Sequence, residues 1–473
     1  MTKSAVTEPV ATKYDAIILG SGQAGNPLAN ALSAKGKRTA LIEHGAVGGT
    51  CINYGCTPTK TLVASAEVAH MARRSMEYGI KVGDVSVDIH SVRERKRGMV
   101  KKWREGTEKR LAEAKLVDLI HGEGSFVGAK TVRVRLNDGG ERTLTADLIV
   151  INTGLRANVP QITGLASVPY LDNASVMELD EVPEQLLVLG GGYVGLEFAQ
   201  MFSRFGSRVT VIQSGKQLLT HEDSDVADAI ANILREDGIE ILLEAQAESA
   251  AACGGEVRLT FKGKGDRREL QGTHLLVATG RSPNTEKLNL PAAGVAMDER
   301  GFIRVNDKLE TSAKGVYAVG DVNGGPAFTH VSYDDFRVLQ TNLLEGGNRS
   351  VAGRLFPYCV FIDPQLGRIG LSENDARKQG RKVRVARLPM NAVARALETG
   401  RSRGFMKALV DPQSEEILGA AILGEEGGEI MSMIQIAMMG KLKYTALQSA
   451  IFAPPLFAES LNNLFSNFQG EAK

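Results

Sequence analysis

Two cysteines with four residues between them, Cys51 and Cys56, are the residues of this sequence best suited to redox chemistry. They lie in the segment GGTCINYGCTPTK, residues 48–60. The other two cysteines, Cys253 and Cys359, belong to no motif, and we interpret them as packing residues. The spacing of the pair differs from the C-x-x-C ligands of zinc sites, and no second ligand pair follows. We therefore predict a redox-active pair and no metal site.

A β-α-β unit precedes the pair, and a second one follows later in the chain. Residues 14–20 and 38–43 predict strands on either side of a helix over 21–36, and strands at 186–190 and 208–213 flank a second helix. The strand-to-helix turns carry Gly20, Gly22 and Gly25 in the first unit and Gly190, Gly192 and Gly195, 170 positions later, in the second. Glycines in this pattern let the backbone approach a pyrophosphate at a helix N-terminus. Two such motifs in full context predict two dinucleotide sites.

The residue eighteen positions beyond the last glycine distinguishes the two sites. It is Glu43 in the first unit, where a carboxylate would accept hydrogen bonds from ribose hydroxyls and suits FAD. It is Gln213 in the second, which does not repel a 2′-phosphate, and Lys216 lies nearby. We predict FAD in the first site and NAD(P)H in the second, with NADPH favoured over NADH. Asp321 ends a strand at 316–321 and is expected to bind the ribityl chain of FAD, with a helix N-cap as the alternative role.

The predicted fold is α/β, with two Rossmann-like dinucleotide-binding domains for FAD and NAD(P) and a C-terminal α+β domain. From about residue 355, short strands at 358–362, 405–410 and 417–423 precede an apolar helix at 429–439, and we expect a mixed sheet there. The predicted segments are 1–157 (FAD-binding, with the cysteine pair), 158–286 (NAD(P)-binding), 287–352 (second FAD-binding part) and 353–473 (C-terminal domain).

The net charge of +1 argues against a nucleic-acid or membrane-surface partner. The most basic run, residues 93–102, is interpreted as the solvated face of a helix. No run of 18 apolar residues predicts a transmembrane helix, and residues 1–13 lack the apolar core of a signal peptide. These features predict a cytoplasmic protein.

The motifs together resemble those of the class I flavoprotein disulfide reductases, which include glutathione reductase, dihydrolipoamide dehydrogenase and mercuric reductase. Residues 48–60 resemble the redox-disulfide motif, GGGYVGLEFA at 190–199 the nicotinamide-binding motif, and VYAVGDV at 316–322 the second FAD motif. The resemblance covers residues 14–465, and the local sequence is most similar to the mercuric-reductase-like branch. It implies a homodimer whose C-terminal domain forms the dimer and whose active site is shared between subunits.

The resemblance also implies roles for single residues. Cys56 would be the flavin-proximal thiolate that forms a charge-transfer pair with FAD, and Cys51 the outer, interchange thiol. A helix predicted over 61–76 would favour a thiolate at its N-terminus. Lys60 and Glu197 would form an ion pair near the flavin, and Tyr193 would gate the nicotinamide pocket. The predicted contacts are Gly20, Gly22, Gly25, Glu43, Gly49, Thr50, Gly124, Thr153, Gly154, Asp321, Thr329 and His330 for FAD, and Gly190, Gly192, Tyr193, Gly195, Gln213, Lys216, Gly280 and Arg281 for NAD(P).

The family's C-terminal acid–base histidine is missing. Members that reduce disulfides carry a His-Pro pair followed by a glutamate, and the His faces the outer cysteine of the other subunit. Here Pro454 stands at the position of the His, Pro455 at that of the Pro, and Glu459 remains as a predicted catalytic residue. Proline cannot transfer protons. We therefore predict an acceptor other than a simple disulfide, such as a metal ion or a quinone, while a disulfide stays possible.

Three relatives or functions remain as alternatives. Mercuric reductases also lack the His but end in a vicinal Cys-Cys pair, whereas this chain ends in NFQGEAK, which puts mercury reduction in doubt. An enzyme like 2-ketopropyl coenzyme M oxidoreductase/carboxylase, which has Phe at the His position, is a second alternative, although the retained Glu459 gives it no support. A low-turnover flavoprotein that acts as a redox sensor is the third.

Overall fold

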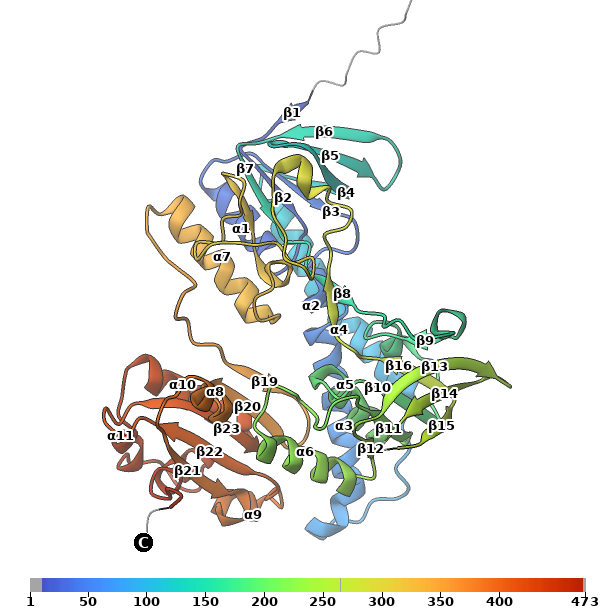
Figure 1. The fold of residues 1–473 in the computed structure, drawn as a ribbon, viewed down its shortest axis with the longest axis vertical. Coiled ribbons are helices and arrows are strands. Elements are labelled where there is room, and N and C mark those ends of the chain that lie inside the picture. The colour runs from blue at the N-terminus through green and yellow to red at the C-terminus, as the bar shows by residue number, and fades with distance from the viewer. Residues whose placement is uncertain (1–10, 264, 471–473) are drawn as a thin grey trace, which may run out of the picture. The chain divides into compact units, whose positions relative to one another are not determined.

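The computed structural model describes residues 11–263 and 265–470 (Figure 1). The chain divides into two compact units. Unit 1 contains Met1–Thr61, Ser91–Asn158 and Arg281–Arg354, and unit 2 contains Leu62–His90, Val159–Gly280 and Leu355–Lys473. Residues 62–90, predicted within the first FAD-binding segment, thus group with unit 2. The predicted domain boundaries otherwise stay predictions.

Unit 1 is built on an eight-stranded sheet in the order β1-β6-β5-β4-β3-β2-β7-β18. The strands from β4 to β18 along this order run parallel, whereas β4, β5 and β6 form an antiparallel meander. The strand bounds are β1 Thr12–Lys13, β2 Ala16–Leu19, β3 Thr39–Glu43, β4 Val117–Gly128, β5 Thr131–Leu136, β6 Glu141–Thr145, β7 Leu148–Ile151 and β18 Val316–Ala318, and β8 Leu155–Ala157 pairs separately with β17 Arg281–Pro283. Apolar clusters of buried residues line both faces of the sheet.

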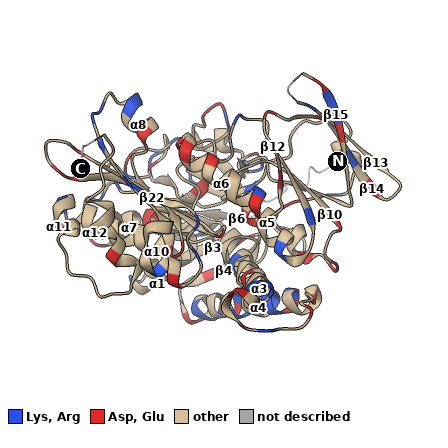
Figure 2. Cartoon of the chain, turned by 90° about the horizontal axis from the view of Figure 1, so that it is seen from below, with Lys and Arg blue, Asp and Glu red and all other residues tan. Residues whose placement is uncertain are grey.

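The helices of unit 1 place the cysteine pair at the edge of this sheet. They are α1 Gly25–Ala34, α2 Gly49–Asn53, the start of α3 Cys56–Arg74, most of α4 Ile89–Glu113, and α7 Thr329–Leu344. Helix α3 begins at Cys56, five residues before the predicted start, because Pro58 in the first turn needs no hydrogen-bond acceptor for its nitrogen. Within α4 (Figure 2) the basic run is mostly exposed and contains one acid, Glu94, but Arg93 and Lys96 are buried.

The nucleotide-binding part of unit 2 has a five-stranded parallel sheet in the order β12-β11-β10-β16-β9. Its strands are β9 Tyr170–Leu171, β10 Gln185–Leu189, β11 Arg208–Ile212, β12 Glu240–Leu242 and β16 His274–Val277, and its helices are α5 Tyr193–Phe205 and α6 Ser224–Glu236. An antiparallel sheet of β13 Gln246–Cys253, β14 Glu256–Lys262 and β15 Arg267–Gly272 packs on this part through a shared apolar cluster. The two predicted Rossmann-like units are therefore confirmed.

The C-terminal part of unit 2 has a five-stranded sheet in the order β19-β20-β23-β22-β21, and every pairing is antiparallel. The prediction of a mixed sheet was wrong. A side chain at Gly367 would lie 2.2 Å from the carbonyl oxygen of Gly427, so these glycines allow α10 to lie close on β20. The elements are β19 Tyr358–Val360, β20 Gln365–Gly370, β21 Arg384–Pro389, β22 Phe405–Val410, β23 Ile417–Gly424, α8 Glu373–Lys378, α9 Ala394–Glu398, α10 Gly427–Met439, α11 Tyr444–Gln448 and α12 Ser460–Leu464.

Short 3-10 helices complete the described part of the chain: η1 Ser75–Tyr78, η2 Leu165–Ser167, η3 Ser175–Glu178, η4 Leu290–Ala293, η5 Gly320–Asn323, η6 Met390–Ala392 and η7 Phe457–Glu459. Among the helices that the structure describes, none combines the length and the apolar character that crossing a membrane requires.

Candidate active site

The two cysteines lie at the ends of neighbouring helices in unit 1. Cys51 is inside the short helix α2, and Cys56 is the first residue of α3. The Sγ atom of Cys56 lies 3.3 Å from the hydroxyl oxygen of Thr329. The hydrogen bond with Cys56, together with burial, raises the pKa of the Cys51 thiol well above its usual range.

Close backbone packing joins the cysteine loop to the first glycine turn. Gly49 has φ +65°, and a side chain there would lie 2.8 Å from the Cα atom of Gly22. Two hydrogen bonds reinforce this contact: the nitrogen of Gly48 donates to Ser21 Oγ at 3.1 Å, and Gln23 Nε2 donates to the carbonyl of Gly48 at 3.2 Å. The redox pair and the first predicted dinucleotide turn thus form one local structure.

Glu43 and Gln213 have matching positions in the two nucleotide folds. Glu43 Oε2 accepts hydrogen bonds from the backbone nitrogen and the hydroxyl of Ser21, at 3.0 and 2.7 Å. Gln213 Oε1 accepts one from the nitrogen of Gly191 at 2.9 Å. Each side chain therefore fixes the first peptide of its glycine turn. Their predicted roles toward the ribose groups stay predictions.

Asn152, which the sequence motifs did not single out, links three segments of unit 1. Its Oδ1 accepts a hydrogen bond from the nitrogen of Gly25 at 2.9 Å, and its Nδ2 donates to the carbonyl of Val319 at 3.0 Å. Asn152 follows β7 directly, so an amide side chain immediately after an apolar strand is the sequence feature that could have identified it. Asn152 holds the start of α1 against the strand ends that carry Asp321.

Asp321 lies in η5 and is fixed by charged neighbours in unit 1. Its carboxylate lies 3.4 Å from Arg281, and burial raises its pKa although the charge of Arg281 acts in the opposite direction. Asp335 of α7 accepts a hydrogen bond from the nitrogen of Gly320 at 2.8 Å and so holds η5. Arg281, predicted to contact NAD(P), also donates to the carbonyl of Ala327 at 2.9 Å. It is grouped with unit 1 because β17 pairs with β8, and its contact with NAD(P) stays a prediction.

The space around each glycine shows whether a predicted dinucleotide would have room to bind there. A side chain at Gly190 would lie 2.4 Å from the carbonyl oxygen of Ala278, and one at Gly195 would lie 2.2 Å from that of Gly190, so both serve close packing. By contrast, no atom of the described chain lies within 4 Å of a side chain built at Gly154, Gly192 or Gly280. Free space beside a glycine turn lets a pyrophosphate approach the backbone closely. The residues present therefore fit FAD in unit 1 and a nicotinamide nucleotide in unit 2.

The other predicted contacts are distributed over these turns. Thr50, Lys216 and His330 are exposed. A side chain at Gly124, in β4, would lie 2.8 Å from Leu19, and the hydroxyl of Thr153 donates to the carbonyl of Asn284 at 2.9 Å. Tyr193 is the first residue of α5, and Gly20 packs against the carbonyl oxygen of Asn152.

The remaining predicted catalytic residues lie in different units. Lys60 is half-buried on α3 in unit 1, whereas Glu197 is buried on α5 in unit 2, where its Oε1 accepts a hydrogen bond from the nitrogen of Phe361 at 2.9 Å. Their ion pair stays a prediction. Pro454 is exposed and is joined to Pro455 by a cis peptide bond, and Glu459 is half-buried in η7.

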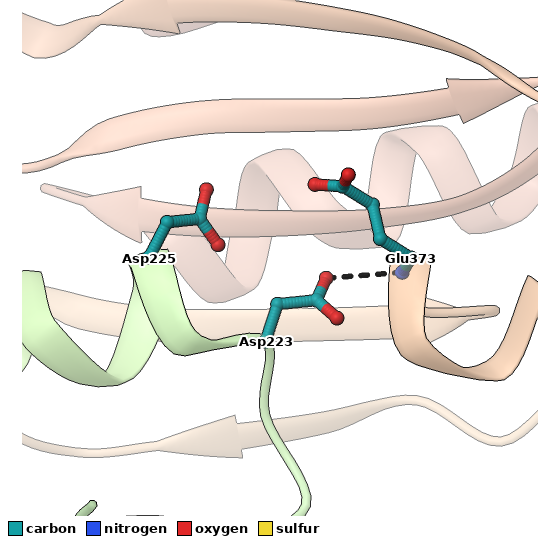
Figure 3. Close-up of side chains that lie close together, drawn as sticks. All are labelled: Asp223, Asp225 and Glu373. Atoms are coloured by element: carbon teal, nitrogen blue, oxygen red, sulfur yellow. Dashed lines mark hydrogen bonds between the residues drawn. The ribbon is translucent and has the colours of Figure 1, made fainter. Parts of the chain in front are cut away.

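A cluster of three carboxylates in unit 2 has the spacing of a metal site. Asp223, Asp225 and Glu373 offer oxygens within 4.8 Å of one another, and Asp223 accepts a hydrogen bond from the nitrogen of Glu373 (Figure 3). The ammonium of Lys407 lies 2.9, 2.7 and 2.8 Å from the three carboxylates. The lysine thus supplies the positive charge that these acids need, and the cluster gives no reason to add a metal site.

Glu222, beside this cluster, should make stability depend on pH. Tyr358 donates a hydrogen bond to its Oε1, and Arg368 Nε lies 3.4 Å from its Oε2. Burial raises its pKa from 4.5 to about 7, and the neighbouring Asp223 acts in the same direction. Because the folded protein holds this proton more tightly than the unfolded chain, Glu222 lowers stability as pH rises from 4.5 through 7, by up to about 3 kcal/mol.

The Glu222→Gln variant should therefore lose less stability than the wild type between pH 5 and 8. The difference between the two proteins is the quantity to measure, by thermal unfolding across this range. His70, whose pKa burial lowers from 6.5 to about 4, produces the opposite trend between those values in both proteins. Parallel pH profiles for the two proteins would contradict the role of Glu222.

Comparisons with known proteins agree with this arrangement over nearly the whole chain. Residues 14–335 match the model of the pyridine nucleotide-disulphide oxidoreductase family, and residues 356–465 match that of its dimerisation domain. A probable pyridine nucleotide-disulfide oxidoreductase, RclA, from Escherichia coli (strain K12) is 38% identical over 458 residues, covering 96% of this chain and 99% of that protein. A mercuric reductase from Staphylococcus aureus is 34% identical over 449 residues, covering 95% and 81%. A dihydrolipoyl dehydrogenase from Geobacillus stearothermophilus is 31% identical over 450 residues, covering 95% of each.

A solved structure is similar over the same share of the chain. It is described as the Cu(II) complex of the HOCl-induced flavoprotein disulfide reductase RclA from Escherichia coli, with a TM-score of 0.88 at 38% identity, and the match covers 96% of this chain and 99% of that one. The family expected from the cysteine, glycine and aspartate motifs is thus confirmed. The chain belongs to the class I pyridine nucleotide-disulphide oxidoreductases, a family of flavoproteins that use FAD and a pyridine nucleotide.

Proposed function

We propose that this protein is an NAD(P)H oxidoreductase that passes electrons from FAD to the Cys51–Cys56 pair and on to a metal ion, with Cu(II) as the favoured acceptor. The observation that carries this proposal is the packing of Gly49 on Gly22, which fixes the cysteine loop on the first dinucleotide turn. Bound FAD would supply the two-electron link between a reduced nicotinamide and the cysteines. The E. coli relative whose solved structure is a Cu(II) complex supports a metal acceptor.

The chemistry of the pair balances with a one-electron acceptor. Reduction of the disulfide takes two electrons and two protons and gives two thiols. Its re-formation returns two electrons, which reduce two Cu(II) ions to Cu(I), and releases two protons. The two protons pass to water and the metal takes up none, so this exchange does not require the family histidine, which Pro454 replaces, to deliver a proton to the acceptor.

We also propose a cytoplasmic homodimer with an active site shared between subunits. The dimerisation-domain match supports the dimer, and Ile436 and Met439 on α10 are largely exposed, as are Ile451 and Leu456 after α11. Such exposed apolar side chains are expected where a second subunit binds. Glu459 would then face the cysteine pair of the partner subunit.

The test is an acceptor comparison on the full-length, FAD-loaded protein with NADPH and NADH. We expect oxidation of the nucleotide with Cu(II), with two Cu(I) formed per nucleotide as measured with a Cu(I)-specific chelator. NADPH should have the higher kcat/KM, because Gln213 does not repel its 2′-phosphate and Lys216 is exposed nearby. Faster turnover with glutathione disulfide or a quinone than with Cu(II) would contradict the proposed acceptor. No turnover above the oxidase background with any acceptor would instead favour a redox sensor.

A further inference from the structure

Three side chains on one face of α5 hold a short segment that follows β19. Glu197 Oε1 accepts a hydrogen bond from the nitrogen of Phe361 at 2.9 Å. Gln200 accepts one from the nitrogen of Asp363 at 2.7 Å and donates one to its carbonyl at 2.9 Å. Arg204 forms an ion pair with the carboxylate of Asp363. The spacing of three and four residues places these side chains on one side of the helix.

Gln200 is the central residue of this contact. It is buried, and its Nε2 also donates to Asp237 Oδ2 at 2.8 Å, so both amide hydrogens and the amide oxygen are bonded. Arg403 donates to the carbonyl of Asp363 at 3.1 Å and pairs with Asp237. Burial alone would raise the pKa of Asp363, but the charge of Arg204 and its hydrogen bond lower it, which keeps Asp363 ionised. The segment is therefore fixed by bonds on both sides.

The consequence concerns the orientation of Glu197. This carboxylate is 3% exposed, and one of its oxygens is held by a backbone N–H whose own position depends on Gln200 and Asp363. We propose that Gln200 and Asp363 are positioning residues that orient Glu197 through the backbone N–H of Phe361. The inference rests on the proposed function and on the position near the flavin that the family resemblance implies for Glu197. A displacement of about 1 Å at such a site costs up to roughly a hundredfold in rate.

The test replaces Gln200 with leucine in the full-length, FAD-loaded protein. Rapid mixing with NADPH under anaerobic conditions measures the limiting rate of flavin reduction and the apparent Kd of the nucleotide. We expect the limiting rate to fall by about tenfold or more while the Kd changes by less than about twofold. Amide hydrogen exchange should be faster in the peptide that contains Phe361. The matched control is Gln185→Leu, which removes a 3.2 Å hydrogen bond to Thr210 between β10 and β11 and none of the hydrogen bonds that hold residues 361–363.

Each result supports or overturns the proposal. An unchanged limiting rate in Gln200→Leu overturns it, as does an equal loss in Gln185→Leu. If Gln200→Leu does not fold, Asp363→Asn keeps the backbone groups and removes only the charge opposite Arg204, and a limiting rate equal to that of the wild type overturns the proposal. A wild-type protein that neither NADPH nor NADH reduces would instead refute the proposed function. In that case unchanged exchange at Phe361 would still overturn the anchoring by Gln200.

Discussion

Replacing Cys51 with serine should reduce acceptor turnover roughly a hundredfold or more, because a single thiol cannot cycle through the disulfide that carries two electrons. The same variant should show a long-wavelength absorption band beyond the flavin peak at neutral pH. The lone Cys56, at the first residue of α3 and 3.3 Å from the Thr329 hydroxyl, is the group expected to give that band as a thiolate beside FAD. Steady-state assays and absorption spectra of the purified variant measure both effects.

Two further variants make this result specific. Cys56→Ser should lose turnover and show no such band, because the flavin-proximal sulfur is gone. Cys253→Ser should change neither quantity, since Cys253 ends β13 in the separate three-stranded sheet of unit 2, next to Arg258. A Cys51→Ser protein that turns over normally, or that lacks the band at neutral pH, would show that the roles of the pair are assigned incorrectly.

Replacing Lys407 with methionine should destabilise the protein by about 3 kcal/mol, because removing the cation leaves its carboxylate partners uncompensated. Lys407 is 1% exposed and contacts Asp223, Asp225 and Glu373. We place the effect at the low end of values for buried ion pairs, since the side chains of Asp225 and Glu373 are 31% and 33% exposed. For a unit of this size such a loss lowers the unfolding midpoint by roughly 6–12 °C, which calorimetry can measure.

The control for this prediction is Lys382→Met, which makes the same chemical change at an exposed position. It should move the unfolding midpoint by at most a degree or two. Burial alone would raise the pKa of Asp223, but the hydrogen bond from Lys407 and two backbone N–H groups lower it. The deficit of Lys407→Met should therefore shrink at acidic pH, where Asp223 becomes protonated and no longer needs the cation. An equal midpoint for Lys407→Met and the wild type would mean that the lysine contributes no net stability.

Local patterns in the sequence were sufficient to predict the two Rossmann-like folds. The strand predicted over residues 38–43 is β3, Thr39–Glu43, and that over 208–213 is β11, Arg208–Ile212. Apolar runs and glycine turns act over a few residues, so their signals survive without knowledge of the rest of the chain. The C-terminal sheet was harder. Three of its five strands, β19, β22 and β23, were predicted, whereas β20 and β21 were not. Strand direction depends on which strands pair, and β20 pairs with β23 across about fifty residues of chain.

The residues that link these elements through ion pairs and hydrogen bonds could not be identified from the sequence. Lys407 lies in an otherwise apolar strand, FMKALV, and a lysine there indicates a buried charge without naming its partners. Those partners are Asp223 and Asp225, 184 and 182 residues earlier, as well as Glu373. Gln200 and Asp363 are equally ordinary in local context, and their link spans 163 residues.

The sequence by itself was enough to predict the chemistry of this protein: a redox-active cysteine pair, two glycine turns for dinucleotides, and a proline where the disulfide-reducing members of the family carry an acid–base histidine. These features depend on residue type and short spacing, which can be read directly from the amino-acid sequence. Only the tertiary structure decided that Gly49 packs on Gly22, that the hydrogen bond with Cys56 and burial raise the pKa of the Cys51 thiol, and that Glu197 accepts a hydrogen bond from the backbone nitrogen of Phe361. Such contacts depend on burial and on distances between atoms that folding brings together, and no local pattern encodes them.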